Sequence, residues 1–433
     1  MGGEHLHQTV LMLLFMVTAL HGQTDRPSGL PEVPTPIIEP DRSDTLTLGL
    51  RVANEFDDNA LNDNRNKQPN LMTVVEPQVT WKLSRTRLEW LLHYTNGFAI
   101  SQQLPAYNSQ SHSLDVRLGF RQTKRLKFSF TNSFLKSTNP FDFFRGAGTG
   151  SGTGPSTQPN DFLLTATANR TSEQAGAEAI YALSRHGMAG VSGSFSSLQY
   201  GAATSSQFPS QFLVDESSMG GSIFYSHHVS RRQWARVDYG VQRLVFSGRS
   251  SLVQNAFYTH TVALSSVSMF SIFAGPERAT SSLLGDAHSP EGPLFVASRA
   301  WHWAGGATYT RSTAGTHLAF GFYRKISSES GLLGAAWLSS ATVEWRQRII
   351  RRWSVDLAGA YDHNQTLDPP RNALSFIWTA VGVSRTLKQD ISVEAKYWRL
   401  HQSTDTLGTG SLVADHNRVS ISLGYDLKAR LNR

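Results

Sequence analysis

Hydrophobic and polar residues alternate one by one along most of this chain from about residue 44 onward. Residues 78–98, QVTWKLSRTRLEWLLHYTNGF, illustrate the pattern. Every second position in the second half of this segment is apolar, at Leu88, Trp90, Leu92 and Tyr94. Successive side chains of a β-strand point to opposite faces of a sheet, whereas a helix would space its apolar residues three and four apart. The segment therefore predicts two antiparallel strands joined by a short basic turn.

The same strand–turn–strand unit recurs along the chain, often with Ser-Arg at the turn. We expect short turns near residues 85, 123, 185, 231, 265, 313, 350 and 386. Eight hairpins give sixteen strands, and a first strand at 45–54 and a last strand at 417–427 bring the expected number to 18, within a range of 16–20. An even number of strands with short turns at one end is typical of antiparallel β-barrels of the bacterial outer membrane.

Longer polar connections alternate with these short turns. They are expected near 55–70, 137–160, 200–217, 276–298, 326–336, 362–373 and 402–416, and a short connection lies near 248–251. The segment 146–160 is rich in glycine but lacks the Gly-Lys-Ser/Thr ending of a phosphate-binding loop, so we interpret it as a surface or constriction loop.

The first 42 residues differ from the rest. Val10 to Leu20 forms an apolar run that is too short to span a bilayer as a helix and is typical of a secretory signal. Five prolines follow between residues 27 and 40, which favours an extended linker. The predicted organisation is a signal peptide at 1–22, a proline-rich periplasmic linker at 23–42 and a β-barrel at 43–433.

A soluble sandwich shows the same alternation with its apolar face turned inward. We favour the inverted arrangement, because the secretion signal sends the chain out of the cytoplasm and only a closed barrel pairs every backbone group within a bilayer. Aromatic residues near strand ends fit the interfacial girdles of such a barrel: Trp81, Tyr94, Trp234, Trp353 and Tyr361. The fold class is therefore all-β, a transmembrane antiparallel up-and-down barrel with longer outer loops.

Composition narrows the chemistry. The chain has no cysteine, which excludes disulfides, thiolate metal sites and a cysteine nucleophile. Its net charge is +7, yet lysine and arginine gather at the turns and form no single tract, so we expect no nucleic-acid partner. The basic turns would form a rim at one end of the barrel, suited to anionic lipid head groups or to drawing anions toward the pore.

A barrel of this many strands is too wide for its own side chains to fill, so it leaves an aqueous channel. The polar faces of the strands carry both signs of charge, and we expect them to line the pore. The predicted pore-lining residues are Glu89, Asp115, Arg117, Lys127, Arg236, Asp238, Glu344, Arg346, Asp356, Glu394 and Lys396. The alternative for each is that it only pairs across the wall and solvates it.

The sequence predicts neither an enzyme nor a metal or cofactor site. No Gly-x-Ser-x-Gly motif and no carboxylate pair at a catalytic spacing is present. His227 and His228 are neighbours on opposite faces of a strand, which makes them a poor chelate. The remaining candidates for a cross-strand metal pair are His302 and His317, which we expect to stand at similar distances from a turn.

The signal, the proline-rich linker and the repeated strand–Ser-Arg–strand hairpins resemble Gram-negative outer-membrane β-barrel porins, specifically the beta-barrel porin type 2 group. This resemblance implies a channel in the bacterial outer membrane for passive diffusion or export of small solutes or oligosaccharides. Outer-membrane lipid and the solute would be its partners. The resemblance does not decide whether the chain forms a homo-oligomer. The alternatives are a structural or adhesive barrel that acts through its outer loops, and an outer-membrane hydrolase.

Overall fold

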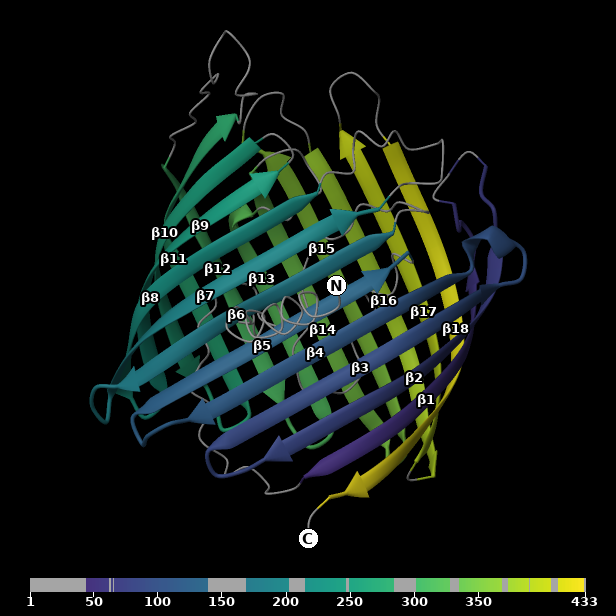
Figure 1. Ribbon diagram of the computed structural model, residues 1–433, viewed down its shortest axis with the longest axis horizontal. Helices are drawn as coiled ribbons and strands as arrows, with labels where there is room; N and C mark the ends of the chain where they lie inside the picture. The colour runs from purple at the N-terminus through teal and green to yellow at the C-terminus, as the bar shows by residue number, and fades with distance from the viewer. Residues whose placement is uncertain are drawn as a thin grey trace, which may run out of the picture.

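The computed structural model shows a single closed sheet of strongly tilted strands (Figure 1). It describes residues 44–61, 64, 66–138, 169–201, 215–246, 249–283, 301–327, 335–367, 373–388, 390–405 and 412–431. The predicted signal peptide and linker lie outside these ranges. The described residues form 18 strands and one short 3-10 helix, η1 (Pro105–Tyr107).

The strands follow one another along the chain. The first nine are β1 (Thr45–Asp57), β2 (Asn70–Ser84), β3 (Leu88–Ser101), β4 (Ser109–Arg121), β5 (Leu126–Ser137), β6 (Arg170–Ala182), β7 (Gly187–Tyr200), β8 (Glu216–Ser230) and β9 (Gln233–Phe246). The second nine are β10 (Arg249–Ala263), β11 (Ser268–Leu283), β12 (Trp301–Ser312), β13 (Thr316–Ser327), β14 (Ala336–Ile350), β15 (Trp353–Thr366), β16 (Ala373–Lys388), β17 (Ile391–Asp405) and β18 (Leu412–Arg430).

Each strand pairs with the strands before and after it in the sequence, and β1 closes the sheet by pairing with β18. All pairings are antiparallel, from Thr45 opposite Arg430 to Asp57 opposite Arg418 at the closing seam. Closure leaves no sheet edge, which is the condition for crossing a bilayer with strands. The predicted up-and-down barrel of about 18 strands is thus confirmed.

The eight short turns fall at one end of the barrel, together with the start of β1 and the end of β18. Seven lie where the alternation predicted them. The eighth was misplaced: Ser384 and Arg385 belong to β16, and the turn follows Lys388. Serine and arginine tolerate an extended strand as well as a turn, so this dipeptide alone did not mark the end of the strand.

Several strands also run further at the other end than the sequence indicated. β1 continues to Asp57 and β11 to Leu283, through residues that were predicted to be loops. β17 extends to Asp405 and β18 begins at Leu412. Backbone hydrogen bonds hold a strand together whatever its side chains, so pairing continues where the apolar alternation fades.

The two faces of the wall differ in polarity. Large apolar side chains on the outer face are exposed, including Leu50 on β1, Ile223 on β8 and Ile421 on β18. Polar and charged side chains with the opposite parity are buried inside, including Glu55, Asp238 and Lys396. This arrangement, with apolar side chains outside and polar ones inside, is the reverse of a soluble protein and is typical of a barrel that spans a membrane. Among the described residues, no helix is both long and apolar enough to cross a bilayer.

Four of the five predicted girdle aromatics lie on the outer face: Trp81, Tyr94, Trp353 and Tyr361. Trp234 was predicted wrongly. It pairs with His228 on the inner face, and the two rings lie 4.9 Å apart. The position of Trp234 next to a turn suggested a girdle, but its parity matches the inward residues Arg236 and Asp238 on the same strand.

Candidate functional site

The inner wall of the barrel is the candidate functional site. All eleven residues that were predicted to line a pore have side chains on this inner face, as the registers show. They occupy three separate arcs. One arc lies on β3–β5 (Glu89, Asp115, Arg117, Lys127), one on β9 (Arg236, Asp238) and one on β14–β17 (Glu344, Arg346, Asp356, Glu394, Lys396). Lining of a conducting pore by these residues stays a prediction.

The arc on β14–β17 contains the first close pair. Asp356 stands opposite Arg346 on β14 and opposite Gly382 on β16, and Gly382 stands opposite Lys396 on β17. The Lys396 Nζ lies 3.9 Å from the Asp356 Oδ2, so the pair reaches across an intervening strand. Both side chains are largely buried. Such a pair holds opposite charges on the inner wall at the cost of desolvating both.

Gly382 makes this contact possible. A Cβ atom at Gly382 would lie 2.6 Å from both carboxylate oxygens of Asp356, well inside van der Waals contact. Glycine therefore leaves the space that the carboxylate occupies between the two flanking strands.

Replacing Gly382 with alanine is expected to push the Asp356 carboxylate away from Lys396 and to lower the free energy of unfolding by about 1 kcal/mol, as mild overpacking does. Urea unfolding of the protein in detergent micelles, followed by tryptophan fluorescence, measures the change. Gly193→Ala is the matched control, because the nearest atom to a Cβ there is 3.8 Å away. Equal stability of the two variants would contradict the packing argument.

The pair on β9 is supported differently. The Arg236 Nε lies 3.7 Å from the Asp238 Oδ2, and the guanidinium carbon lies 3.8 Å from the ring centre of Phe224 on β8. The aromatic face and the carboxylate together fix an arginine that would otherwise be mobile. The residues on β3–β5 are less buried than those of the other two arcs, and Glu89 is exposed beside the turn.

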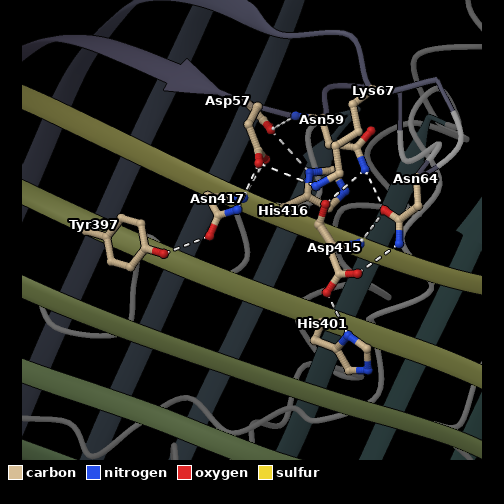
Figure 2. A network of polar contacts seen from close by, with 10 residues as sticks. Asp57, Asn59, Asn64, Lys67, Tyr397, His401, Asp415, His416 and Asn417 are labelled. Carbon is tan, nitrogen blue, oxygen red and sulfur yellow. Dashed lines mark hydrogen bonds and ion pairs between the residues drawn. The ribbon is translucent and has the colours of Figure 1, made fainter.

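Sequence reasoning missed a fourth group, on the closing seam between β1 and β18. Arg418 donates from its Nη2 to the Asp57 Oδ2 at 2.9 Å and from its Nη1 to the Glu55 Oε2 at 3.3 Å. The His416 Nδ1 lies 3.2 Å from the Asp57 Oδ1, which also accepts the backbone N–H of Asn59 at 2.9 Å. We name Glu55, Asp57, His416 and Arg418 the seam cluster; part of it is visible in Figure 2.

A signal for the seam cluster was present in the sequence. Glu55 and Asp57 continue the parity of Arg51, which faces inward and binds Glu76 on β2 at 2.7 Å. Arg418 likewise shares the parity of Ser420 and Ser422. Ending the first strand at Asn54 placed both carboxylates in a loop, so their common face with Arg418 was not recognised.

Near the loop end of the barrel, the ends of β13–β15 pack against the inner face of β9–β11. Leu244, Val253 and Ala279, which point inward from β9, β10 and β11, pack in one cluster with Ile326 of β13. Ile326 and Trp337 have the parity of the outer face, yet both contact this cluster. The loop ends of β13–β15 therefore lie on the lumen side of β9–β11. We name the segment formed by residues 325–327 and 335–338 the inward flap.

Two contacts from the neighbouring strands hold the inward flap. Glu277, an inward residue of β11, accepts the backbone N–H of Ile326 at 2.7 Å and is almost fully buried. His302 of β12 lies edge-on to Trp337 with ring centres 4.8 Å apart. Pairing between β12 and β13 begins only at Gly305 opposite Arg324, so the two strands separate where the flap turns inward.

The histidine candidates for a metal pair do not meet. His317 stands opposite Ser312 beside the turn, whereas His302 stands opposite Glu277 at the far end of β12. The expectation of similar distances from the turn was wrong, because His317 adjoins the turn whereas His302 lies near the opposite end of β12. His227 points outward and His228 inward. In the ranges that the structure covers, no group of three or more His, Cys, Asp or Glu residues could hold a metal ion.

No family model matches this chain, and no curated protein matches its sequence. Solved structures of similar outline include OccAB4 of Acinetobacter baumannii, at 10% identity over 90% of this chain and 100% of that one, with a TM-score of 0.41. OpdK of Pseudomonas aeruginosa with vanillate matches at 8% identity over 89% and 99%, with a TM-score of 0.42. OccK2 (OpdF) of the same organism in complex with glucuronate matches at 8% identity over 90% and 98%, also with a TM-score of 0.42.

Proposed function

We propose that this protein is a channel of the bacterial outer membrane that admits small polar solutes through a narrowed, mixed-charge lumen. The observation that carries the proposal is the closed barrel of 18 strands with apolar side chains outside and charged side chains inside. Barrels of this size enclose more space than their side chains fill. The short-turn end then faces the periplasm and the loop end faces outward.

The charges on the inner wall point to a solute that is polar without being strongly anionic or cationic. Lys396 and Asp356, and Arg236 and Asp238, place both signs close together on the inner face. A wall with paired charges gives a solute donors and acceptors at short intervals and little net field. The inward flap would narrow the passage near its outer mouth, which favours small solutes or single sugar units over longer oligosaccharides.

One observation favours a second candidate, a barrel that does not conduct and acts through its outer surface. The inner faces of β16–β18 are apolar in part, and Phe376, Leu400 and His416 are each exposed by 1% or less. Phe376 and Leu400 pack in one buried cluster with Trp378 and Trp398 on the inner face. The two candidates differ in one property, which is whether ions pass.

Conductance of the refolded protein in a planar lipid bilayer separates the two candidates. Unitary current steps that scale with salt concentration are expected for the channel. A protein that migrates as a heat-modifiable barrel in gels but gives no steps would reject the channel and support the non-conducting barrel.

A matched pair of charge variants tests the inner wall. Lys396→Gln is expected to shift the reversal potential in a salt gradient toward cation preference, because Asp356 then lacks its nearest cation. Asp356→Asn is expected to shift it the opposite way. Shifts of the same sign, or none in either variant, would show that this pair does not face the ion path.

A further inference from the structure

The outer wall carries a polar patch at the loop ends of β15–β18, at the upper border of the apolar band. His363, Ser375, Ser403 and His401 all have outward parity here, and so does Asp415. Exposed apolar side chains adjoin the patch, among them Tyr361, Ile377 and Val413. Polar side chains on a lipid-facing wall raise the free energy of the folded protein unless they form hydrogen bonds, and those that occur there often have a function.

The centre of this patch is a histidine oriented by a carboxylate. The His401 Nδ1 lies 2.8 Å from the Asp415 Oδ1, and Asn64 donates from its Nδ2 to the other carboxylate oxygen at 2.8 Å. The backbone N–H of Asp415 donates in turn to the Asn64 Oδ1 at 2.9 Å. Figure 2 shows Asp415 held between His401 and Asn64. With Asp415 accepting the Nδ1–H, the Nε2 of His401 is the basic nitrogen.

A serine stands on the same face of the same strand. Ser403 follows His401 by two residues on β17, so both side chains project from the outer wall as neighbours. Ser403 also stands opposite Ser375 of β16, whose hydroxyl lies 2.9 Å from the Nδ1 of His363. Ser403, His401 and Asp415 thus supply a hydroxyl, a base and a carboxylate that orients the base, the roles of a Ser-His-Asp triad.

We propose that Ser403, His401 and Asp415 form a second, catalytic site that hydrolyses carboxylic esters of membrane lipids. The Ser403 hydroxyl oxygen bonds to the ester carbonyl carbon while its proton passes to the His401 Nε2. The carbon–oxygen ester bond then breaks, and the lipid alcohol leaves with that proton. Water gives a proton to His401 and attacks the acyl-serine, and the fatty acid leaves as Ser403 regains its proton. The net reaction consumes one water for each ester.

The place of the site identifies the substrate class. It lies on the outer wall at the loop end, which the proposed membrane placement puts beside the outer leaflet. The exposed side chains of Tyr361 and Ile377 lie on the turn side of His363 and Ser375, where acyl chains would pass. Arg399 also faces outward on β17, two residues nearer the turn end than His401. The substrate class is therefore a long-chain acyl ester of a membrane lipid.

Acyl release from defined lipids tests the proposal with the full-length protein. The protein is incubated with vesicles of phosphatidylethanolamine and phosphatidylglycerol in one arm and with purified lipopolysaccharide in the other, and released fatty acid is measured by mass spectrometry. Release in either arm is expected and identifies which lipid is cleaved. A fluorophosphonate probe is expected to label Ser403, located by peptide mass spectrometry. If heat-modifiable protein shows no fatty-acid release in either arm and no labelling of Ser403, the proposal is overturned.

Matched variants separate chemistry from folding. Ser403→Ala is expected to lower acyl release at least about 1,000-fold, as removal of a triad nucleophile does, while heat-modifiability and conductance stay unchanged. Ser375→Ala, one strand away, is expected to keep the wild-type rate. An unchanged rate in Ser403→Ala, or an equal loss in Ser375→Ala, would overturn the assignment.

Asp415 is a positioning residue that acts through His401. Its test therefore needs a measurement that would stay unchanged if Asp415 only stabilised the fold. Asp415→Asn is expected to lower the rate about 100-fold or more and to change the pH dependence of the rate, because the asparagine favours the wrong tautomer of His401. Asp415→Glu is expected to recover part of the rate. A loss in Asp415→Asn with an unaltered pH profile and no recovery in Asp415→Glu would remove Asp415 from the site. Loss of conductance alone would reject the channel and leave this site standing.

Discussion

Replacing Arg418 with methionine is expected to lower the free energy of unfolding by about 3–5 kcal/mol. Arg418 binds both Glu55 and Asp57, and the side chains of all three are exposed by 4% or less. The substitution removes a buried cation while two buried carboxylates stay in place. Since β1 and β18 close the barrel, the loss falls on the pairing that completes the sheet.

A compensated variant distinguishes electrostatics from packing. Combining Arg418→Met with Glu55→Gln and Asp57→Asn removes the charges together, and this triple variant is expected to be more stable than the single variant. Arg231→Ala, at an exposed turn, is the control and is expected to change stability by about 0.5 kcal/mol or less. The measurement is urea unfolding in micelles. A single variant as stable as the wild type would show that the seam does not depend on Arg418.

The barrel was predictable because its evidence is local. Alternation with a period of two is set by the strand itself, so residues such as Leu92 and Glu89 reveal their faces without knowledge of any partner. The inward direction of Asp356 and Lys396 follows from the same parity. The even strand number follows from counting hairpins, each of which is made by residues close together in the chain.

Contacts between distant segments were not predictable in this way. Asp57 and Arg418 meet although 361 residues separate them, because the first and last strands close the barrel in one particular register. His401 and Ser403 share a face that sequence alone can give, but the place of Asp415 beside His401 depends on the pairing of β17 with β18. The inward flap breaks the parity rule itself, since Ile326 packs on the lumen side despite its outward parity.

Because the inward flap departs from the parity rule, its contact with Glu277 leads to the second large predicted loss of stability. Glu277→Ala is expected to destabilise the barrel by up to about 3 kcal/mol, because it leaves the buried N–H of Ile326 without its acceptor. Glu277→Gln keeps an acceptor oxygen at the same place and is expected to lose less. The N–H of Ile326 depends on Glu277 because β12 and β13 are no longer paired at this level, so no backbone carbonyl of β12 accepts it.

The same substitution links the fold to the proposed channel. Without the Glu277 contact, the loop ends of β13–β15 lose an anchor to β11, and the inward flap is expected to withdraw from the lumen for part of the time. Unitary conductance in a planar bilayer should then rise and become noisier in Glu277→Ala and stay near the wild-type value in Glu277→Gln. Lower stability with unchanged conductance would mean that the inward flap supports the wall without narrowing the passage. Higher conductance in the alanine variant alone would identify the flap as the constriction, because the two variants differ chiefly in the acceptor for one N–H.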